Sequence, residues 1–307
     1  MKTALAFLLS ILMMVFVFSR FNFSEFQGYL SQIDYLIFAL AVLFFIPQVA
    51  LSAYRWQVMM KKRANLTFWT SIKLILAASA INILIPSRVG DLSKAYFGGR
   101  GGSFDMKRGM NVVLFEKYMD LFSLSVVTVT GVLCAPQWDK LNLAGLGFSA
   151  SMFIIFPILY FLNLETYLRY SFFERHKFLM KIKNFLLDTH AYLDEIKNDK
   201  PQLIFIVLLS IVLWFLHLLQ FYFMFLALHS QVSAFDVFRL VPLAILVGLI
   251  PLTLAGMGTR DSAMIYIFKP YESAALIAGV GLFASLRYFV PGILGLPFLN
   301  QYLVKKR

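Results

Sequence analysis

The fold is decided by a stretch that reads Leu84-Ile85-Pro86-Ser87-Arg88-Val89-Gly90-Asp91. The same order returns as Leu249-Ile250-Pro251 and, after a short insertion, Gly256-Met257-Gly258-Thr259-Arg260-Asp261. Each copy contains an apolar limb, a proline break, a hydroxyl residue, an arginine, an aspartate and a second limb. Because proline interrupts a helix and glycine permits a sharp turn, each copy predicts a broken helical hairpin, and the two form an internal repeat.

The composition around these hairpins is that of a membrane protein. Of the 307 residues, 60% are hydrophobic and 14% charged, against about half and about a quarter in a soluble domain. A single cysteine, Cys134, excludes an intramolecular disulfide. The alternation typical of a membrane barrel is absent. We therefore expect an all-α polytopic bundle in which residues 1–307 form one integral membrane domain.

Six other apolar runs are expected to cross the bilayer, whose hydrocarbon core takes about 20 helical residues. They cover residues 3–18, 33–53, 111–134, 143–162, 202–228 and 273–299. The first run is short. It is followed by no small-residue cleavage site, so we expect an uncleaved span.

The distribution of the 28 Lys and Arg residues decides how the two hairpins run. If both crossed the membrane, fewer cations would lie on the cytoplasmic side than outside, against the positive-inside rule. If each hairpin enters and leaves on one face, 21 cations lie inside and four outside. We expect this second arrangement, with both termini cytoplasmic and the hairpins dipping from opposite faces. Since the rule accounts for the net charge of +12, no nucleic-acid partner is expected.

Inverted repeats with broken helices are a transporter architecture, and the breaks point to the substrate site. The expected hairpin tips are Pro86, Ser87, Gly90, Pro251, Gly256, Gly258 and Thr259. Ser87 and Thr259 stand where a helix N-cap is expected, and an arginine follows each. Helix N-terminal amides and a guanidinium together favour phosphate. The alternative is that Arg88 and Arg260 form structural pairs with Asp91 and Asp261.

A third cluster of charges lies early in the 111–134 span. Glu116 and Asp120 share a helix face, and Lys117 and Asp120 are spaced to pair, which leaves one carboxylate over. That carboxylate is expected to accept a proton, contact a cationic head group or bond to Arg88. The alternative is an ion pair that reaches interfacial water.

The remaining polar residues are assigned more simply. Arg287, in the last span, is expected to be a further phosphate contact or a counter-ion, whereas Arg55 is expected to be an interfacial topology anchor and no part of a site. Trp214 and His217 are expected to serve in packing and interhelical hydrogen bonding. We expect no catalytic residue, metal or cofactor. The whole expected substrate-binding set is Arg88, Asp91, Lys94, Glu116, Lys117, Asp120, Arg260, Asp261 and Arg287.

Residues 163–201 form the longest polar segment, and apolar residues recur in it at alternating spacings of three and four. This pattern predicts an amphipathic cytosolic helix. Its early cations suit anionic head groups, so we expect it to lie on the membrane. Packing against its own bundle and a dimer contact are the alternatives.

The stretches at Pro86 to Asp91, Glu116 to Asp120 and Gly256 to Asp261 resemble the three signature regions of the lysylphosphatidylglycerol synthase transmembrane-region family, also called flippase-like proteins. That family commonly carries Glu where this chain has Asp91 and Asp261. The resemblance implies a prokaryotic inner-membrane protein that moves a lipid or lipid-linked substrate between leaflets. Full-length synthases add a cytosolic aminoacyl-transferase domain, and since nothing follows Arg307, lysyl transfer is not expected here.

We therefore expect a flippase for phosphate-bearing lipids, whose partners are membrane phospholipids or lipid-linked glycans, with a homodimer or a separate biosynthetic enzyme as a further partner. The alternative is an integral membrane transferase acting on a polyprenyl phosphate or phospholipid, with Asp91 or Glu116 as base. An assembly subunit is a third reading, for which the amphipathic helix is the sole support.

Overall fold

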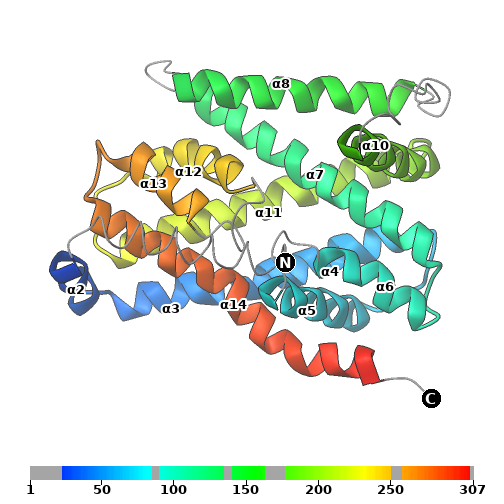
Figure 1. Cartoon of the computed structure of the whole chain (residues 1–307), viewed down its shortest axis with the longest axis horizontal. Helices are drawn as coiled ribbons and strands as arrows, with labels where there is room; N and C mark the ends of the chain where they lie inside the picture. The colour runs from blue at the N-terminus through cyan, green and yellow to red at the C-terminus, as the bar shows by residue number, and fades with distance from the viewer. Residues whose placement is uncertain (1–22, 85–89, 135–139, 163–176, 250–257, 305–307) are drawn as a thin grey trace.

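The computed structural model describes residues 23–84, 90–134, 140–162, 177–249 and 258–304 (Figure 1). Over these ranges the chain is helical and contains no strand, so the all-α class is confirmed. The helices are α2 (Phe23–Ser31), α3 (Tyr35–Leu43), α4 (Phe45–Met60), α5 (Phe68–Leu84), α6 (Ser93–Arg100), α7 (Met106–Leu133), α8 (Lys140–Phe161), α10 (Lys177–Ile196), α11 (Lys200–Ala227), α12 (Ala234–Gly248), α13 (Thr259–Phe268) and α14 (Ala274–Val304).

Four helical segments in the described ranges are long and apolar enough to cross a membrane. They are Tyr35–Met60, Asn142–Phe161, Lys200–Ala227 and Ala274–Leu303, and each coincides with a predicted span. The predicted span at 111–134 lies in α7, whose 28 residues extend for about 42 Å. The predicted span at 3–18 lies outside the described residues.

Both interrupted segments contain two helices, as predicted. α5 and α6 flank the first break, and α12 and α13 flank the second. In the first hairpin, α5 packs against α14 and α6 against α7; in the second, α12 packs against α7 and α13 against α14. The two hairpins therefore contact α7 and α14 in exchanged order, while the inverted repeat stays a prediction.

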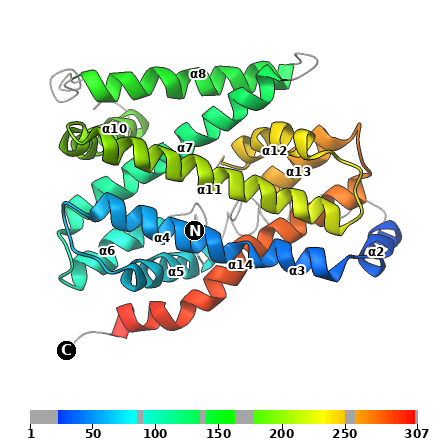
Figure 2. The same ribbon diagram turned by 180° about the vertical axis from the view of Figure 1, so that it is seen from behind.

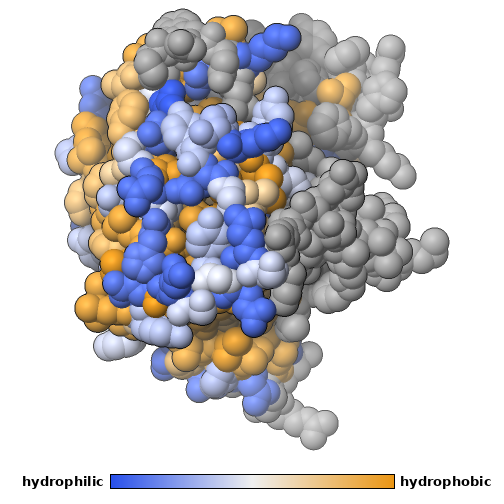
Figure 3. Space-filling model, turned by 90° about the vertical axis from the view of Figure 1, so that its left-hand side faces the viewer, coloured by the Kyte–Doolittle hydropathy of each residue, from blue (hydrophilic) through white to orange (hydrophobic). Residues whose placement is uncertain are grey.

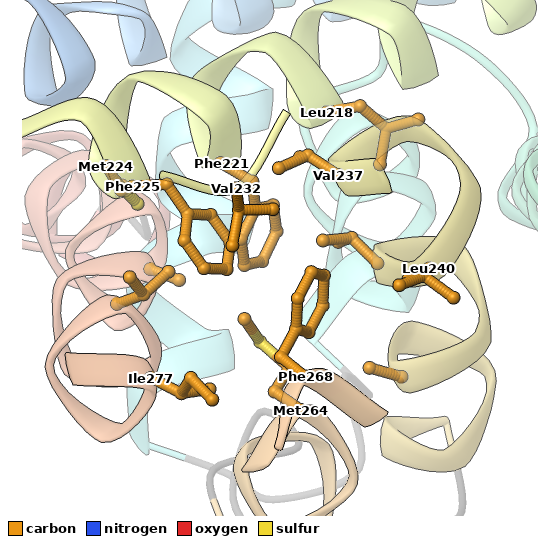
Figure 4. Packing of buried hydrophobic residues seen from close by; sticks show 14 of the residues in the cluster. Leu218, Phe221, Met224, Phe225, Val232, Val237, Leu240, Met264, Phe268 and Ile277 are labelled. Atoms are coloured by element: carbon orange, nitrogen blue, oxygen red, sulfur yellow. The ribbon is translucent and has the colours of Figure 1, made fainter. Parts of the chain in front are cut away.

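Two large hydrophobic clusters hold the bundle together. One lies among α11, α12, α13 and α14, where Phe221, Phe225 and Phe268 are fully buried (Figure 4). The other joins α4, α7, α8, α10 and α11 around Trp56 and Phe115. Helices α7 and α11 contribute to both clusters, and Figure 2 shows α11 running the length of the bundle.

The loops gather at two ends of the bundle. At the end nearest α10, Lys62 pairs with Asp199 at 3.2 Å, and Arg63 pairs with Glu195 at 2.6 Å. At the other end, Glu272 accepts hydrogen bonds from Ser230 and Gln231, and Figure 3 shows a hydrophilic patch bordered by apolar surface there. The grouping matches the predicted loop arrangement, while the compartment that each end faces stays a prediction.

Helix α10 packs against the bundle through its second half. Tyr192, Leu193 and Ile196 are buried, and the Tyr192 hydroxyl donates a 2.7 Å hydrogen bond to the Met59 carbonyl. Burial raises the pKa of Tyr192 above its ordinary value, so this hydroxyl stays protonated and able to donate. The second half of α10 therefore packs against its own bundle, which was one of the alternatives to membrane contact. Since Met180 stays exposed, membrane contact by the first half of the helix remains a prediction.

Candidate functional site

Arg55 lies on the inner face of α4, with a side chain that is 3% exposed. Its Nη2 pairs with Glu116 at 2.9 Å, and its Nη1 pairs with Asp120 at 2.7 Å. The same Nη1 donates to the Ser210 hydroxyl on α11 at 2.8 Å. The prediction that Arg55 is an interfacial anchor is wrong, because α4 continues to Met60 and places this side chain between α7 and α11.

Two lysines complete this group of charges. Lys94 on α6 pairs with Glu116, and its ammonium lies 4.7 Å from the centre of the Trp56 ring. Lys117 pairs with Asp91 and lies 3.6 Å from Asp120. Glu116 therefore pairs with two cations. The prediction from helix spacing that it is left over without an ion-pair partner is wrong. The expected pairing of Lys117 with Asp120 is present.

Asp91 lies in the tight turn that leads into α6. It accepts a 2.9 Å hydrogen bond from the Asn82 side chain near the end of α5. Gly90 allows the chain to turn back closely against α5, because a Cβ at this position would lie 2.6 Å from the Ala78 carbonyl oxygen. The first hairpin is thus joined to α7 by Asp91 and by Lys94.

We call this group the N-terminal cluster. It consists of three cations and three carboxylates, namely Arg55, Lys94, Lys117, Asp91, Glu116 and Asp120. The charges balance within the cluster, and each carboxylate takes part in at least one ion pair. Arg55, Lys94 and Glu116 are the buried members, and removal of any one of them leaves an uncompensated buried charge.

A second group of charges lies at the start of α13. Its helix N-cap is Gly258, at φ of 95°, and not Thr259 as the sequence predicted. Thr259 is the first helical residue, and Arg260 is the second. Asp261 performs the capping, since its carboxylate accepts the Gly258 N–H at 3.1 Å. A positive φ at this position favours glycine.

Arg260 is 2% exposed, and its guanidinium is held by residues of α13 and α14. Its Nε donates to Asp261 at 2.8 Å, and its Nη2 donates to the Gly281 carbonyl on α14 at 2.8 Å. Its Nη1 is buried and makes no hydrogen bond. The predicted pair of Arg260 with Asp261 is therefore present, with one guanidinium nitrogen left over.

Arg287 lies beside Arg260. Both guanidinium groups face the Phe221 ring of α11, at 5.8 Å for Arg260 and 5.3 Å for Arg287. Arg287 donates to the Tyr288 hydroxyl at 2.7 Å, and the same hydroxyl interacts with Arg260. We call Arg260, Asp261, Arg287 and Tyr288 the C-terminal cluster.

Helix α11 connects the two clusters. Ser210 binds Arg55, and the Trp214 indole donates a 2.8 Å hydrogen bond to the Asp120 carbonyl, which confirms the predicted interhelical role of Trp214. Phe221 lies 11 residues beyond Ser210, which is about 16 Å along a helix. The clusters thus occupy two levels of one bundle.

Four of the predicted tip residues lie outside the described residues, namely Pro86, Ser87, Pro251 and Gly256, and so does the predicted substrate contact Arg88. The proposed contacts of Arg88 with Asp91 or Glu116 are therefore predictions still. In contrast, four residues of the clusters were not predicted as site residues: Arg55, Asn82, Ser210 and Tyr288. A signal for Arg55 was present, since it stands more than a turn before the Lys61-Lys62-Arg63 run that ends the helix.

The family model for the lysylphosphatidylglycerol synthase TM region matches residues 3–295 of the chain. A UPF0104 membrane protein from Methanothermobacter thermautotrophicus is 23% identical over 310 residues, covering 92% of this chain and 91% of the relative. A UPF0104 membrane protein from Methanocaldococcus jannaschii is 29% identical over 218 residues, covering 68% of this chain and 88% of the relative. Another from that organism is 24% identical over 291 residues, covering 89% and 85%.

Proposed function

This chain belongs to the lysylphosphatidylglycerol synthase TM-region family, and from that membership and its two buried charge clusters we propose that it moves phosphate-bearing lipids between the leaflets of a prokaryotic inner membrane. The substrate head group passes through the bundle while its tails stay in the lipid. The substrates are phospholipids or lipid-linked glycans.

The observation that carries the proposal is the presence of charged groups beside both helix breaks of an apolar bundle. Ionisable residues are costly inside a membrane, and they mark the paths of substrates or ions. The breaks belong to hairpins that contact α7 and α14 in exchanged order, as expected for an inverted repeat. Opposed hairpins of this kind would open the bundle to one face at a time.

We expect transport to be driven without a P-loop nucleotide site, because the sequence contains no Gly-x-x-x-x-Gly-Lys pattern. Coupling to an ion, a lipid gradient or a separate partner would then drive transport.

The ion pairs weigh against the transferase alternative. A general base needs a carboxylate that is free to take a proton. Glu116 is paired with Arg55 and Lys94, and Asp91 is paired with Lys117, so a base role would first require either carboxylate to leave its partners. A mass change of a polyprenyl phosphate on incubation with the purified protein would nevertheless establish the enzyme and overturn the transporter.

Lipid translocation tests the proposal directly. The purified chain in liposomes with a fluorescent phosphatidylglycerol should speed the exchange of label between leaflets, measured by dithionite quenching. The double variant Arg88→Ala and Arg260→Ala should lose about tenfold or more of this rate, because charge-assisted hydrogen bonds to phosphate are lost.

Arg239→Ala is the matched control for that experiment. Arg239 is also a buried arginine, but it lies near the start of α12, where it pairs with Asp236 at 2.9 Å and donates to the Tyr271 hydroxyl that follows α13. Its removal should leave the rate within about twofold of wild type. A double variant that transports as fast as wild type would exclude Arg88 and Arg260 from the mechanism.

The proposed topology can be tested by cysteine labelling. Cys134 is exposed, so it is first replaced by serine. Lys62 and Lys269 lie at the two opposite polar ends, and both are exposed. In intact spheroplasts an impermeant maleimide should modify Lys269→Cys and not Lys62→Cys. Labelling of both positions from outside would contradict cytoplasmic termini and the opposed hairpins.

A further inference from the structure

We infer that the more exposed side of the N-terminal cluster is a site for a zwitterionic head group, one that carries a primary ammonium and a phosphate. Lys117 takes the phosphate, and Asp91 and Asp120 take the ammonium. The inference rests on the proposed function, and it names the class of phospholipid that the first hairpin binds.

Exposure divides the N-terminal cluster into two groups. The inner group has side chains that are 3% or 4% exposed, and it consists of Arg55, Lys94 and Glu116. The outer group has side chains that are 18%, 34% and 27% exposed, and it consists of Asp91, Lys117 and Asp120. Because a ligand reaches exposed groups first, the outer group is the one that can bind it. The inner group supports the outer group through the pair of Arg55 with Asp120.

Charge favours a ligand that is neutral as a whole. The three cations and three carboxylates of the cluster balance one another. An anion alone would draw Lys117 away and leave Asp91 without its cation, and an uncompensated charge in such a site is costly. A zwitterion avoids this cost, since its phosphate binds Lys117 while its ammonium replaces Lys117 beside the carboxylates.

Hydrogen bonding favours an ammonium that carries N–H groups. Asp120 Oδ1 accepts from Arg55, whereas Oδ2 accepts no hydrogen bond among the described residues and lies 3.6 Å from Lys117. Asn82 donates to Asp91 through its amide nitrogen at 2.9 Å, and its Oδ1 is buried and has no donor in the described part of the chain. Acceptors left without a donor indicate a missing N–H or O–H group.

Lys117 is the cation of the cluster best able to change partners. A lysine ammonium is a point charge with three donors on a flexible stem, whereas an arginine guanidinium is a rigid fork. The fork of Arg55 is fixed by Glu116, Asp120 and the Ser210 hydroxyl. Lys117 has ion pairs with two carboxylates of the outer group, and one of the two is at 3.6 Å. A phosphate can therefore bind Lys117 while Arg55 stays in place.

The neighbours of Lys117 on α7 favour a lipid over a free head group. Leu114 is three residues before Lys117 and Leu121 is four residues after it, so the three side chains share one face of the helix. Both leucines are half-buried, while the residues between them on the other faces of α7 are buried. A charged site between two accessible apolar side chains fits an amphiphile whose tails lie along α7.

Equilibrium binding tests the site without relying on transport. The full chain, purified in a neutral detergent, is mixed with phosphatidylethanolamine, phosphatidylglycerol or phosphatidylcholine of the same tails, and bound lipid is counted by native mass spectrometry. Phosphatidylethanolamine should bind at least tenfold more tightly than either of the others. Phosphatidylglycerol has no ammonium, and the quaternary ammonium of phosphatidylcholine has no N–H group to donate.

Two variants assign the two ends of the head group. Asp120→Asn should weaken the binding of phosphatidylethanolamine about tenfold and leave that of phosphatidylglycerol unchanged, because only the ammonium loses its partner. Lys117→Gln should weaken both lipids, since both carry the phosphate, and Lys117→Arg should restore much of the binding. A purely structural role of Asp120 would not change the preference between the two lipids.

Asp236→Asn is the matched control. Asp236 is 20% exposed and pairs with Arg239 at 2.9 Å, so it resembles the outer carboxylates but lies near the start of α12. The variant should keep the wild-type preference for phosphatidylethanolamine. Thermal unfolding of each variant identifies any that is misfolded, and Asp91→Asn replaces Asp120→Asn if the latter fails to fold. Wild-type preference in a folded variant of either outer carboxylate, or equal binding of the three lipids by the wild type, would overturn the inference.

Water-soluble glycerophosphoethanolamine distinguishes the two sources of the head group. Competition at millimolar concentration would support a site that recognises the head group from either source, and carboxylate-dependent binding without competition would support a site for the lipid. The same samples are assayed for translocation in liposomes. Carboxylate-dependent binding without translocation would refute the transporter and keep the site. Translocation without a preference for phosphatidylethanolamine would refute the site and keep the transporter.

Discussion

Replacement of Arg55 by glutamine is expected to lower the free energy of unfolding by about 3–5 kcal/mol. Its side chain is 3% exposed, and it is the partner of Glu116 at 2.9 Å and of Asp120 at 2.7 Å. Glutamine is too short and uncharged, so two carboxylates inside the bundle would lose their shared cation. Lys94 and Lys117 would still hold one carboxylate each. Unfolding of the purified chain in mixed micelles, followed by circular dichroism as the SDS fraction rises, measures the loss.

Two controls separate the buried network from ordinary ion pairing. Lys62→Gln breaks a pair with Asp199 in which both side chains are exposed, and it should change the stability by less than about 1 kcal/mol. Adding Asp120→Asn to Arg55→Gln removes one of the orphaned charges and should recover part of the loss. If Arg55→Gln were as mild as Lys62→Gln, Arg55 would be a topology anchor after all.

The fold was largely predictable because its determinants are local in sequence. Apolar runs of about 20 residues determined the spans, and Pro86 and Pro251 with the glycines that follow determined where two of the helices break. The resulting limbs are α5 with α6 and α12 with α13. Helix periodicity also located the face of α10 that Leu193 and Ile196 bury. None of these features requires knowledge of which helices are neighbours.

The partners of the charges were not predictable in the same way. Spacing along one helix compares Glu116 only with residues three or four positions away, whereas its two cations come from α4 and α6. Arg55 was counted with the loop cations because it precedes Lys61, yet the helix continues past it and turns it inward. The capping of α13 was misassigned for a related reason. A hydroxyl is a common N-cap, but here Gly258 at positive φ allows Asp261 to reach back instead.

The packing of α5 against α14 leads to the second large expected effect, at Gly295. A Cβ built there would lie 1.9 Å from the Leu76 carbonyl oxygen, a backbone atom that cannot rotate away. Gly295→Ala should therefore force the two helices apart and lower the free energy of unfolding by about 3 kcal/mol or more. Small residues permit close backbone approach between membrane helices, and Gly292, one turn earlier against Ile83, extends the same contact.

Gly147 in α8 is the matched control, because a Cβ there would meet nothing within 4 Å. Gly147→Ala should raise the stability by about 0.5–1 kcal/mol, since alanine is the better helix former. Both variants are measured in the same SDS titration, and a loss at Gly147 equal to that at Gly295 would show that close packing is not the cause.

The contact between α5 and α14 also affects the position of the site residues. Arg287 is eight residues before Gly295 on α14, and Asn82, which binds Asp91, lies six residues after Leu76 on α5. A displaced α14 would therefore shift Arg287 relative to the first hairpin, so Gly295→Ala should also slow the translocation of fluorescent phosphatidylglycerol in liposomes by the fraction of protein that remains folded.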